Sequence, residues 1–160
     1  MRLTHTDEQG AARMVDVGGK PVTVREAVAA GCVRMSAEAF ALVRDNAVAK
    51  GDVLAIARLA GIAGAKRTAD LVPLCHPLAL DVVEVDAEAD ADLPGVRIRA
   101  RTRATARTGV EMEALAAVMA ACLTVYDMVK AVDRGMRIEE VRLLSKTGGT
   151  RGDWTAPAGD

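Results

Sequence analysis

Residues 111–130 read EMEALAAVMAACLTVYDMVK, and this stretch holds thirteen consecutive uncharged residues, from Ala114 to Tyr126. Apolar side chains occupy every side of the implied helix rather than one stripe, which is typical of a helix buried on all sides. Carboxylates and a lysine stand at the two ends of the run, where the protein interior would meet a cleft. Because burial shifts side-chain pKa values toward those useful in acid–base chemistry, we expect a functional site at this helix.

The composition is that of one globular domain. The chain has 160 residues, enough for a substantial core, and we expect a single domain over residues 1–160 with loose arms at 1–13 and 147–160. Lys and Arg number 21 against 22 Asp and Glu, a balance that argues against a nucleic-acid or membrane-surface binder. Aromatic residues make up only 2%, too few for a base-stacking platform. Hydrophobic residues reach 51%, and we expect part of that surface to be buried in an oligomer.

Cysteine and histidine usage gives no sign of a metal site. The three cysteines, Cys32, Cys75 and Cys122, form no CxxC pair, and the chain has only two histidines, His5 and His76. The polar start, MRLTHTDEQG, does not resemble a signal peptide, and the longest apolar run is shorter than the roughly 20 residues of a membrane-spanning helix. We therefore expect a reduced, cytoplasmic protein that contacts no membrane and binds no metal.

Two helices are predicted upstream of the long one. Ser36 is an N-cap for a helix that continues to about Val48, after a short strand at Val33–Met35. Asp52 can cap a second helix that runs to about Lys66. Small residues in this second helix would let another element approach closely; they are Ala57, Gly61 and Gly64.

A β-hairpin is predicted immediately before the long helix. Apolar and charged residues alternate with period two over residues 83–88 and again over 96–101, and the sequence DLPG at 92–95 supplies the turn. The preceding segment, LVPLCHPL at 71–78, contains two prolines and is expected to be an irregular crossing.

Capping signals indicate the ends of the long helix. Thr108 and Glu111 have the spacing of a capping box, and Gly135 can end the helix. Apolar residues around Val141 indicate a last strand. The order of helices, hairpin, long helix and strand predicts an α+β fold in which helices cover one face of an antiparallel sheet.

Asp127 and Lys130 end the uncharged run three positions apart and therefore share one helical face. They form either a surface ion pair, which would contribute little, or a desolvated couple that can exchange a proton with a substrate. The apolar surroundings favour the desolvated couple.

Glu113 precedes Asp127 by fourteen residues, so the two face the same way but lie roughly 21 Å apart along the helix axis. Either a long ligand or a site built from two subunits would use both, and we favour two subunits.

Three further segments have both a structural and a functional interpretation. His76 follows Cys75 in the irregular segment. A lone histidine is usually structural, but its place in a loop strengthens the functional interpretation. Cys75 is a possible nucleophile, but no base and orienting group can be assigned to it.

Arginines at 97, 99, 101 and 103 share one strand face, where pairing with Glu84, Asp86 and Glu88 is favoured over phosphate binding. GIAGAKRT at 61–68 lacks the Walker spacing, although Lys66 and Arg67 remain candidate anion contacts.

Several blocks of the sequence resemble those of one known family. The blocks are MVDV (14–17), TVREA (23–27), KGDV (50–53), AGIAGAKRTADLVPLCHPL (60–78), TGVEMEAL (108–115), LTVYDMVKA (123–131) and LLSKTGG (143–149). They resemble the cyclic pyranopterin monophosphate synthases, the MoaC family, over about residues 3–154. The LCHP and VEMEAL blocks are highly specific.

The resemblance implies an enzyme, a lyase of molybdenum cofactor biosynthesis. Enzymes of this family convert 3′,8-cyclo-7,8-dihydro-GTP, which an upstream radical GTP cyclase supplies, into cyclic pyranopterin monophosphate and diphosphate. The resemblance also implies a ferredoxin-like fold and a homohexamer built as a trimer of dimers, with pockets at a dimer interface. No cofactor is expected.

The same resemblance, carried over block by block, implies the site residues. Asp127 resembles the family's catalytic acid/base residue, and Lys130 and Lys50 resemble its essential lysines. Five residues match the segments that hold the substrate: Leu74, Cys75, His76, Met112 and Glu113. Three more match the surroundings of the pocket: Lys66, Glu111 and Lys146. The reaction requires several proton transfers, and a desolvated lysine beside a carboxylate can supply a pKa near neutrality.

The chain departs from the family pattern in two places, and two other classes of protein remain possible. TGGTRGDW at 147–154 stands where relatives commonly carry an SGGK-type sequence, so a lysine contact is either taken by Arg151 or lost. Ala116 stands where a threonine is frequent.

A non-catalytic nucleotide-binding domain would tolerate Asp127→Asn without functional loss. An RNA-binding module of similar topology is disfavoured by the scarcity of aromatic residues and the near-neutral charge.

Overall fold

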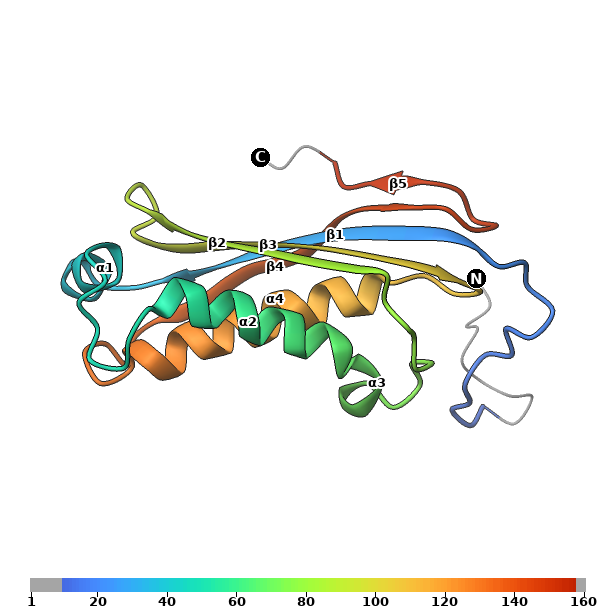
Figure 1. Cartoon of the computed structure of the whole chain (residues 1–160), viewed down its shortest axis with the longest axis horizontal. Helices are drawn as coiled ribbons and strands as arrows, with labels where there is room; N and C mark the ends of the chain where they lie inside the picture. Colours follow the sequence, from blue (N-terminus) through green and yellow to red (C-terminus); the bar gives the residue numbers. More distant parts are fainter. Residues whose placement is uncertain (1–9, 158–160) are drawn as a thin grey trace.

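Five antiparallel strands with two long helices on one face make up the structure, a computed structural model that describes residues 10–157 (Figure 1). The strands are β1 (Thr23–Arg34), β2 (Val82–Asp90), β3 (Gly95–Ala106), β4 (Arg137–Thr147) and β5 (Trp154–Thr155). The helices are α1 (Ala37–Arg44), α2 (Val53–Lys66), α3 (Thr68–Leu71) and α4 (Glu111–Val129). The strand order is β2-β3-β1-β4-β5, and the first four strands with their helices follow the β-α-β-β-α-β ferredoxin-like pattern. The predicted α+β class is confirmed, and most of the arm predicted at residues 1–13 lies outside the described residues.

The central strand, β1, is much longer than the sequence predicts. A short strand was expected at Val33–Met35, but β1 begins at Thr23 and pairs with β3 on one side and β4 on the other. Its middle section consists mostly of small residues that are buried on both faces of the sheet. A strand buried on both faces lacks the apolar–polar alternation that identifies a half-exposed strand, so the pattern was missed.

The predicted hairpin of β2 and β3 is confirmed, and the predicted pairing of an arginine with Glu84 is present. Glu84 lies opposite Arg101 and Asp86 opposite Arg99. The Arg101 guanidinium lies 3.0 Å from the Glu84 carboxylate and 2.6 Å from that of Glu26 on β1. For Arg101, cross-strand pairing is therefore the correct interpretation, not phosphate binding.

The two N-caps predicted from the sequence are present. The Ser36 hydroxyl accepts a hydrogen bond from the Ala39 amide of α1, and the Asp52 carboxylate accepts one from the Ala55 amide of α2. The first helix is shorter than expected, since α1 ends at Arg44 instead of Val48.

Removal of the α2 cap should have a measurable cost. We expect Asp52→Ala to lower the free energy of unfolding by about 1 kcal/mol, because one amide at the helix start loses its partner. Asp52→Asn keeps a side-chain acceptor and should stay within a few tenths of a kcal/mol of the wild type. Urea unfolding of the three proteins measures both values, and equal losses in the two variants would contradict a capping role.

Close packing of α2 on α4 depends on two glycines. A Cβ added to Gly61 would lie 3.1 Å from the carbonyl oxygen of Ala117, and one added to Gly64 would lie 3.0 Å from that of Ala116. These distances are shorter than ordinary van der Waals contact, so the two helices approach as closely as predicted from their small residues. The contact places the start of α4 beside the end of α2.

The ends of α4 differ from the prediction. The N-cap is Val110, with no side-chain cap, so Thr108 and Glu111 do not form a capping box. The helix ends at Val129 and not near Gly135. The Asp133 carboxylate accepts hydrogen bonds from the amides of Ser36 and Gly135, which ties the turn after α4 to the start of α1.

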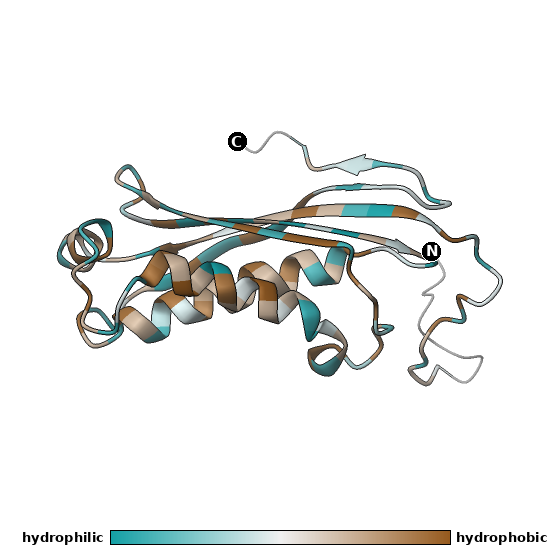
Figure 2. Cartoon of the chain, in the orientation of Figure 1, coloured by the Kyte–Doolittle hydropathy of each residue, from teal (hydrophilic) through white to brown (hydrophobic). Residues whose placement is uncertain are grey.

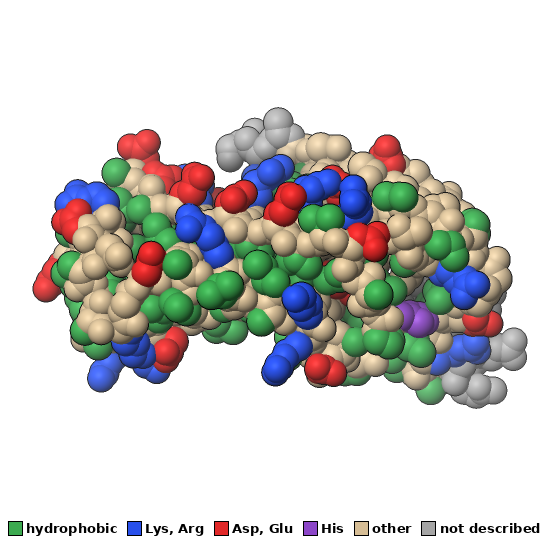
Figure 3. Space-filling model, in the orientation of Figure 1, with side chains coloured by type: hydrophobic (Ala, Val, Ile, Leu, Met, Phe, Trp, Pro, Cys, Tyr) green, Lys and Arg blue, Asp and Glu red, His purple; other side chains and the backbone are tan. Residues whose placement is uncertain are grey.

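The prediction that α4 is buried on every side is wrong for the single chain. The sheet covers one side of the helix and α2 flanks another, but the outward side remains uncovered, with Met119 and Leu123 exposed. On α2, Ile56 and Leu59 are exposed as well. Apolar residues run along this helical layer in Figure 2, and the space-filling view shows apolar side chains spread over it (Figure 3).

By length and composition alone, α4 would suffice to cross a membrane, and among the described helices it is the one that would. Half of it is buried against the rest of the fold, however, as in the core helix of a globular domain.

Candidate functional site

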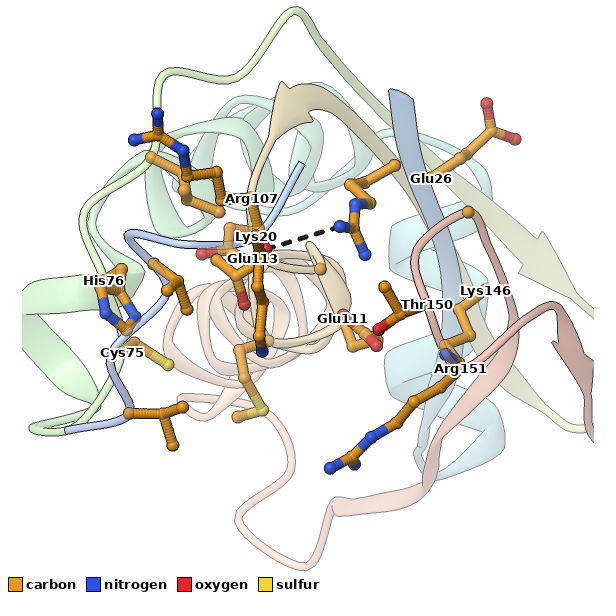
Figure 4. Close-up of a pocket in the computed structure, with 18 of the residues that line it drawn as sticks. Lys20, Glu26, Cys75, His76, Arg107, Glu111, Glu113, Lys146, Thr150 and Arg151 are labelled. Carbon is orange, nitrogen blue, oxygen red and sulfur yellow. Dashed lines mark hydrogen bonds between the residues drawn. The ribbon is translucent and has the colours of Figure 1, made fainter. Parts of the chain in front are cut away.

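A cavity of about 420 Å³ lies where the start of α4 meets the start of β1 and the ends of β3 and β4. Side chains from segments far apart in the sequence converge on it (Figure 4). All five residues predicted to bind substrate line this cavity: Leu74, Cys75, His76, Met112 and Glu113. The fold thus brings the LCHP and VEMEAL blocks together.

Local structure explains how these two blocks are held. After α3 the chain turns, with the Cys75 amide donating to the Val72 carbonyl oxygen at 3.0 Å, and then runs irregularly to β2 as its two prolines predict. The start of α4 is fixed to the sheet by the buried Thr102 hydroxyl, which donates to the Val110 carbonyl oxygen at 3.0 Å. Met112 and Glu113 in the first helical turn therefore face the cavity from a rigid support.

Basic side chains outnumber acidic ones around the cavity. Five cations line it: Lys20, Arg25, Arg107, Lys146 and Arg151. Three carboxylates line it: Glu26, Glu111 and Glu113. Figure 4 shows the Glu26 carboxylate turned away from the others, consistent with its ion pair to Arg101. A concave site with excess positive charge favours an anionic ligand, and arginines suit phosphate groups in particular.

Glu113 is the buried acid of the site. The residue is 4% exposed, and burial, helped by the nearby Glu111 carboxylate, raises its pKa to about 6. A carboxyl with this pKa exchanges protons readily near neutral pH, which suits it to hold or transfer a proton. Within one chain, the pKa of Glu113 is closer to neutral than that of Asp127.

The raised pKa of Glu113 predicts a pH-dependent stability. As the pH rises, the Glu113 carboxyl ionises at lower pH in the unfolded chain than in the folded one. Its contribution to the free energy of unfolding is therefore complete below about pH 4.5 and is lost as the pH rises through about 6. We expect the wild type to lose about 2 kcal/mol of unfolding free energy relative to Glu113→Gln between pH 4 and pH 7.5. Urea unfolding across this range is the measurement. Met112→Leu changes the neighbouring pocket residue without altering a titratable group and should keep the wild-type dependence; a parallel profile for Glu113→Gln would contradict the assignment.

Cys75 lines the cavity as a thiol. Burial and the Glu113 carboxylate raise its pKa, which disfavours the thiolate that a nucleophilic cysteine requires. The raised pKa therefore argues against a nucleophilic role for Cys75, and its position leaves it able to contact a ligand in the cavity. Within residues 10–157, no three His, Cys, Asp or Glu side chains are grouped as a metal site would require.

A second cluster of charged residues lies at the opposite end of α4. Lys130 Nζ lies 2.7 Å from one oxygen of the Asp127 carboxylate, and Lys50 Nζ lies 2.9 Å from the other. Lys50 also donates to the Asp127 carbonyl oxygen at 2.8 Å, which ties the loop before α2 to the end of α4. The three residues predicted to be catalytic thus meet in one place.

This cluster is exposed in the single chain, contrary to the expected desolvated couple. Side-chain exposure is 58% for Asp127, 51% for Lys130 and 47% for Lys50. Hydrogen bonds from Lys130 and then from Lys50 lower the Asp127 pKa to about 2. The expectation that the couple is desolvated was wrong for the single chain, because apolar neighbours along a helix do not cover a residue at its exposed end. Asp127 is a carboxylate at neutral pH, able to accept a proton or orient the two ammonium groups.

The two clusters do not meet within one chain. Fourteen residues of helix separate Glu113 from Asp127, which corresponds to roughly 21 Å. None of the three residues of the second cluster lines the cavity. A small ligand in the cavity therefore does not reach Asp127 of the same chain.

Other predicted residues divide between the cavity and the surface. Glu111, Lys146 and Arg151 line the cavity, whereas Lys66 and Arg67 at the end of α2 are exposed and do not. Arg25 and Arg107 of the cavity were not predicted as site residues. Arg25 lies in the TVREA block, but nothing in the sequence pattern marks it as buried.

Comparisons with known proteins agree with this geometry. A family model described as the MoaC family matches residues 14–149. A protein of Cereibacter sphaeroides named cyclic pyranopterin monophosphate synthase is 60% identical over 156 residues, covering 98% of each chain. Proteins with the same name from Thermomicrobium roseum (59% identity, 95% of this chain and 92% of the relative) and Parvibaculum lavamentivorans (56%, 97% of each) are also similar. A nearly full-length match of this kind establishes what the blocks of sequence suggested: this chain belongs to the MoaC family.

Proposed function

We propose that this protein is a cyclic pyranopterin monophosphate synthase, a lyase of molybdenum cofactor biosynthesis. It converts 3′,8-cyclo-7,8-dihydro-GTP into cyclic pyranopterin monophosphate and diphosphate. The observation that carries the proposal is the cavity, which is lined both by the LCHP and VEMEAL blocks and by several cationic side chains. Relatives at 56–60% identity that bear this enzyme name support it over almost the whole chain.

The proposed chemistry matches the groups available. Formation of the cyclic phosphate joins a substrate oxygen to the α-phosphorus and breaks the bond to the β-phosphate, so diphosphate leaves with its negative charge. Cationic side chains that already face the cavity would stabilise this charge. Rearrangement of the purine requires proton transfers, which we assign to Asp127, Lys130 and Lys50, with Glu113, His76 and their neighbours holding the substrate.

The separation of the two clusters leads us to propose a site shared between protomers. The Asp127 cluster of one chain would complete the cavity of another, which would also cover and desolvate the lysines. The exposed apolar residues of α2 and α4 supply a surface that association would bury. We propose a homohexamer, arranged as a trimer of dimers, that works in the cytoplasm and receives its substrate from a radical GTP cyclase.

A coupled assay tests this function. The purified chain is supplied with the product of a radical GTP cyclase, and formation of cyclic pyranopterin monophosphate and diphosphate is followed together. Both products should appear in equal amounts with the wild type. Binding of the substrate without turnover, and no effect of Asp127→Asn, would instead indicate a non-catalytic nucleotide-binding domain.

A further inference from the structure

The turn that follows α4 carries Lys130, and one residue of the helix, Tyr126, contacts this turn at both of its ends. The carbonyl oxygen of Tyr126 accepts a hydrogen bond from the Lys130 amide at 2.9 Å. The phenol of Tyr126 donates a hydrogen bond to the carbonyl oxygen of Arg134 at 3.0 Å. Residues 130–134 are therefore enclosed between two contacts with the same tyrosine.

A second residue joins the same turn to another part of the fold. The Asp133 carboxylate accepts hydrogen bonds from the amides of Ser36 and Gly135, both at 2.7 Å. Ser36 is the N-cap of α1, so Asp133 holds the turn from the side of α1. Tyr126 holds it from the side of α4.

The geometry of the pair formed by Asp127 and Lys130 depends on this turn. Lys130 is the C-cap of α4 and keeps helical angles, with φ −56° and ψ −18°. Two side chains three positions apart lie next to each other only while the backbone between them is helical. If the turn opened and Lys130 left this conformation, its 2.7 Å contact with the Asp127 carboxylate would be lost.

The ion pair is too weak to hold the backbone in this conformation. More than half of each side chain is exposed, 51% for Lys130 and 58% for Asp127, and exposed ion pairs contribute little to stability. The last turn of a helix also opens easily, because its final carbonyl groups have no partner within the helix. A contact from outside the pair is therefore required to keep Lys130 in place, and the Tyr126 phenol supplies one.

We infer that Tyr126 is a positioning residue, whose phenol fixes the turn after α4 so that Lys130 stays beside Asp127 for proton transfer. The inference rests on the proposed function for the role of Lys130. The phenol acts through the Arg134 carbonyl oxygen and the backbone, not through contact with the substrate. Because reaction rates fall steeply when a reacting group is displaced, loss of this bond should affect the chemical step more than substrate binding.

The variant Tyr126→Phe tests the inference, because it removes the phenol oxygen and keeps the ring. In the coupled assay we expect kcat to fall about 10-fold, with KM within about twofold of the wild-type value. The matched control is Thr124→Val, which removes a different hydroxyl of α4. That hydroxyl donates to the Ala120 carbonyl oxygen at 2.8 Å, away from the turn, so Thr124→Val should keep the wild-type kcat. Wild-type kcat in folded Tyr126→Phe would overturn the inference.

Combination with Lys130→Gln separates a positioning role from a general structural one. If Tyr126 acts through Lys130, the addition of Tyr126→Phe to Lys130→Gln should lower kcat by less than about twofold more. A tyrosine that only stabilised the fold would cause the same loss in both backgrounds. A further loss of about 10-fold in the double variant would therefore contradict the positioning role.

Amide hydrogen exchange tests the turn itself, without turnover. The amides of Lys130, Val132 and Asp133 donate to carbonyl oxygens of α4 and should exchange slowly in the wild type. In Tyr126→Phe they should exchange about 10-fold faster, whereas Thr124→Val should leave their rates unchanged. Exchange of these amides in the wild type as fast as in an unstructured peptide would refute the inference, whether or not Tyr126→Phe folds.

These experiments distinguish failure of the inference from failure of the proposed function. If the wild type makes no pyranopterin, the proposed function fails, while the exchange rates still decide whether Tyr126 holds the turn. If the wild type turns over normally and Tyr126→Phe matches it, the inference fails alone.

Discussion

Replacement of Lys130 by Gln should lower kcat for pyranopterin formation by about 10²- to 10⁴-fold while the protein stays folded. Gln has similar length and can still donate a hydrogen bond to Asp127, but it can neither carry the charge nor transfer the proton. The ion pair is exposed, so its loss should have little effect on stability. The coupled assay measures the rate, and thermal unfolding measures the stability.

Two controls sharpen this prediction. Lys130→Arg keeps the positive charge but not an ammonium that can give up its proton, so it should fold normally and remain impaired in turnover. Arg142→Gln removes an exposed cation of β4 outside both clusters and should leave turnover unchanged. Near-normal turnover by folded Lys130→Gln would remove this residue from the mechanism, although the family assignment would stand.

Mixing two inactive variants should restore activity if the site is shared between protomers. Asp127→Asn damages the cluster at one end of α4, and Glu113→Gln damages the cavity at the other. In a symmetric dimer each site would take its cavity from one chain and its Asp127 from the other. A mixed dimer then contains one site with both halves intact and one site with both halves altered.

The expected recovery follows from random pairing. Half of the dimers are mixed and half of their sites are intact, so co-refolded variants should reach about a quarter of wild-type activity. Co-refolding either variant with itself is the control and should restore nothing. If the mixture shows only the sum of the residual activities, the site lies within one chain, and a large rearrangement would be required to bring Asp127 to the cavity.

The elements that were predicted correctly are those in which local residues decide the outcome. The hairpin follows from period-two alternation and a Pro-Gly turn, and both N-caps follow from a short polar side chain before an apolar run. β1 was mostly missed because a strand buried on both faces has no alternation to recognise. The end of α4 was missed because the turn after Val129 is held by Asp133 bonding to Ser36, nearly a hundred residues earlier.

For the candidate site as well, the sequence motifs were predicted more successfully than features that depend on distant residues. The LCHP and VEMEAL blocks were identified as substrate-binding segments, and they do line one cavity. Burial was harder to predict from the sequence. Asp127 was expected to be sheltered and is exposed, whereas Arg25 was not singled out and is buried. Both errors concern solvent exposure, which depends on residues that are distant in the sequence.

By itself, the sequence determined the family, the fold class and the chemical groups available for catalysis, because these depend on residue identity and local spacing. Only the tertiary structure decided which groups meet. Lys50 joins Asp127 across 77 positions, and the pairing of β1 with β4 brings Arg25 beside Gly149 in the loop after β4. The physical reason is that charge pairing and loss of hydration act between neighbours in space, and folding chooses those neighbours.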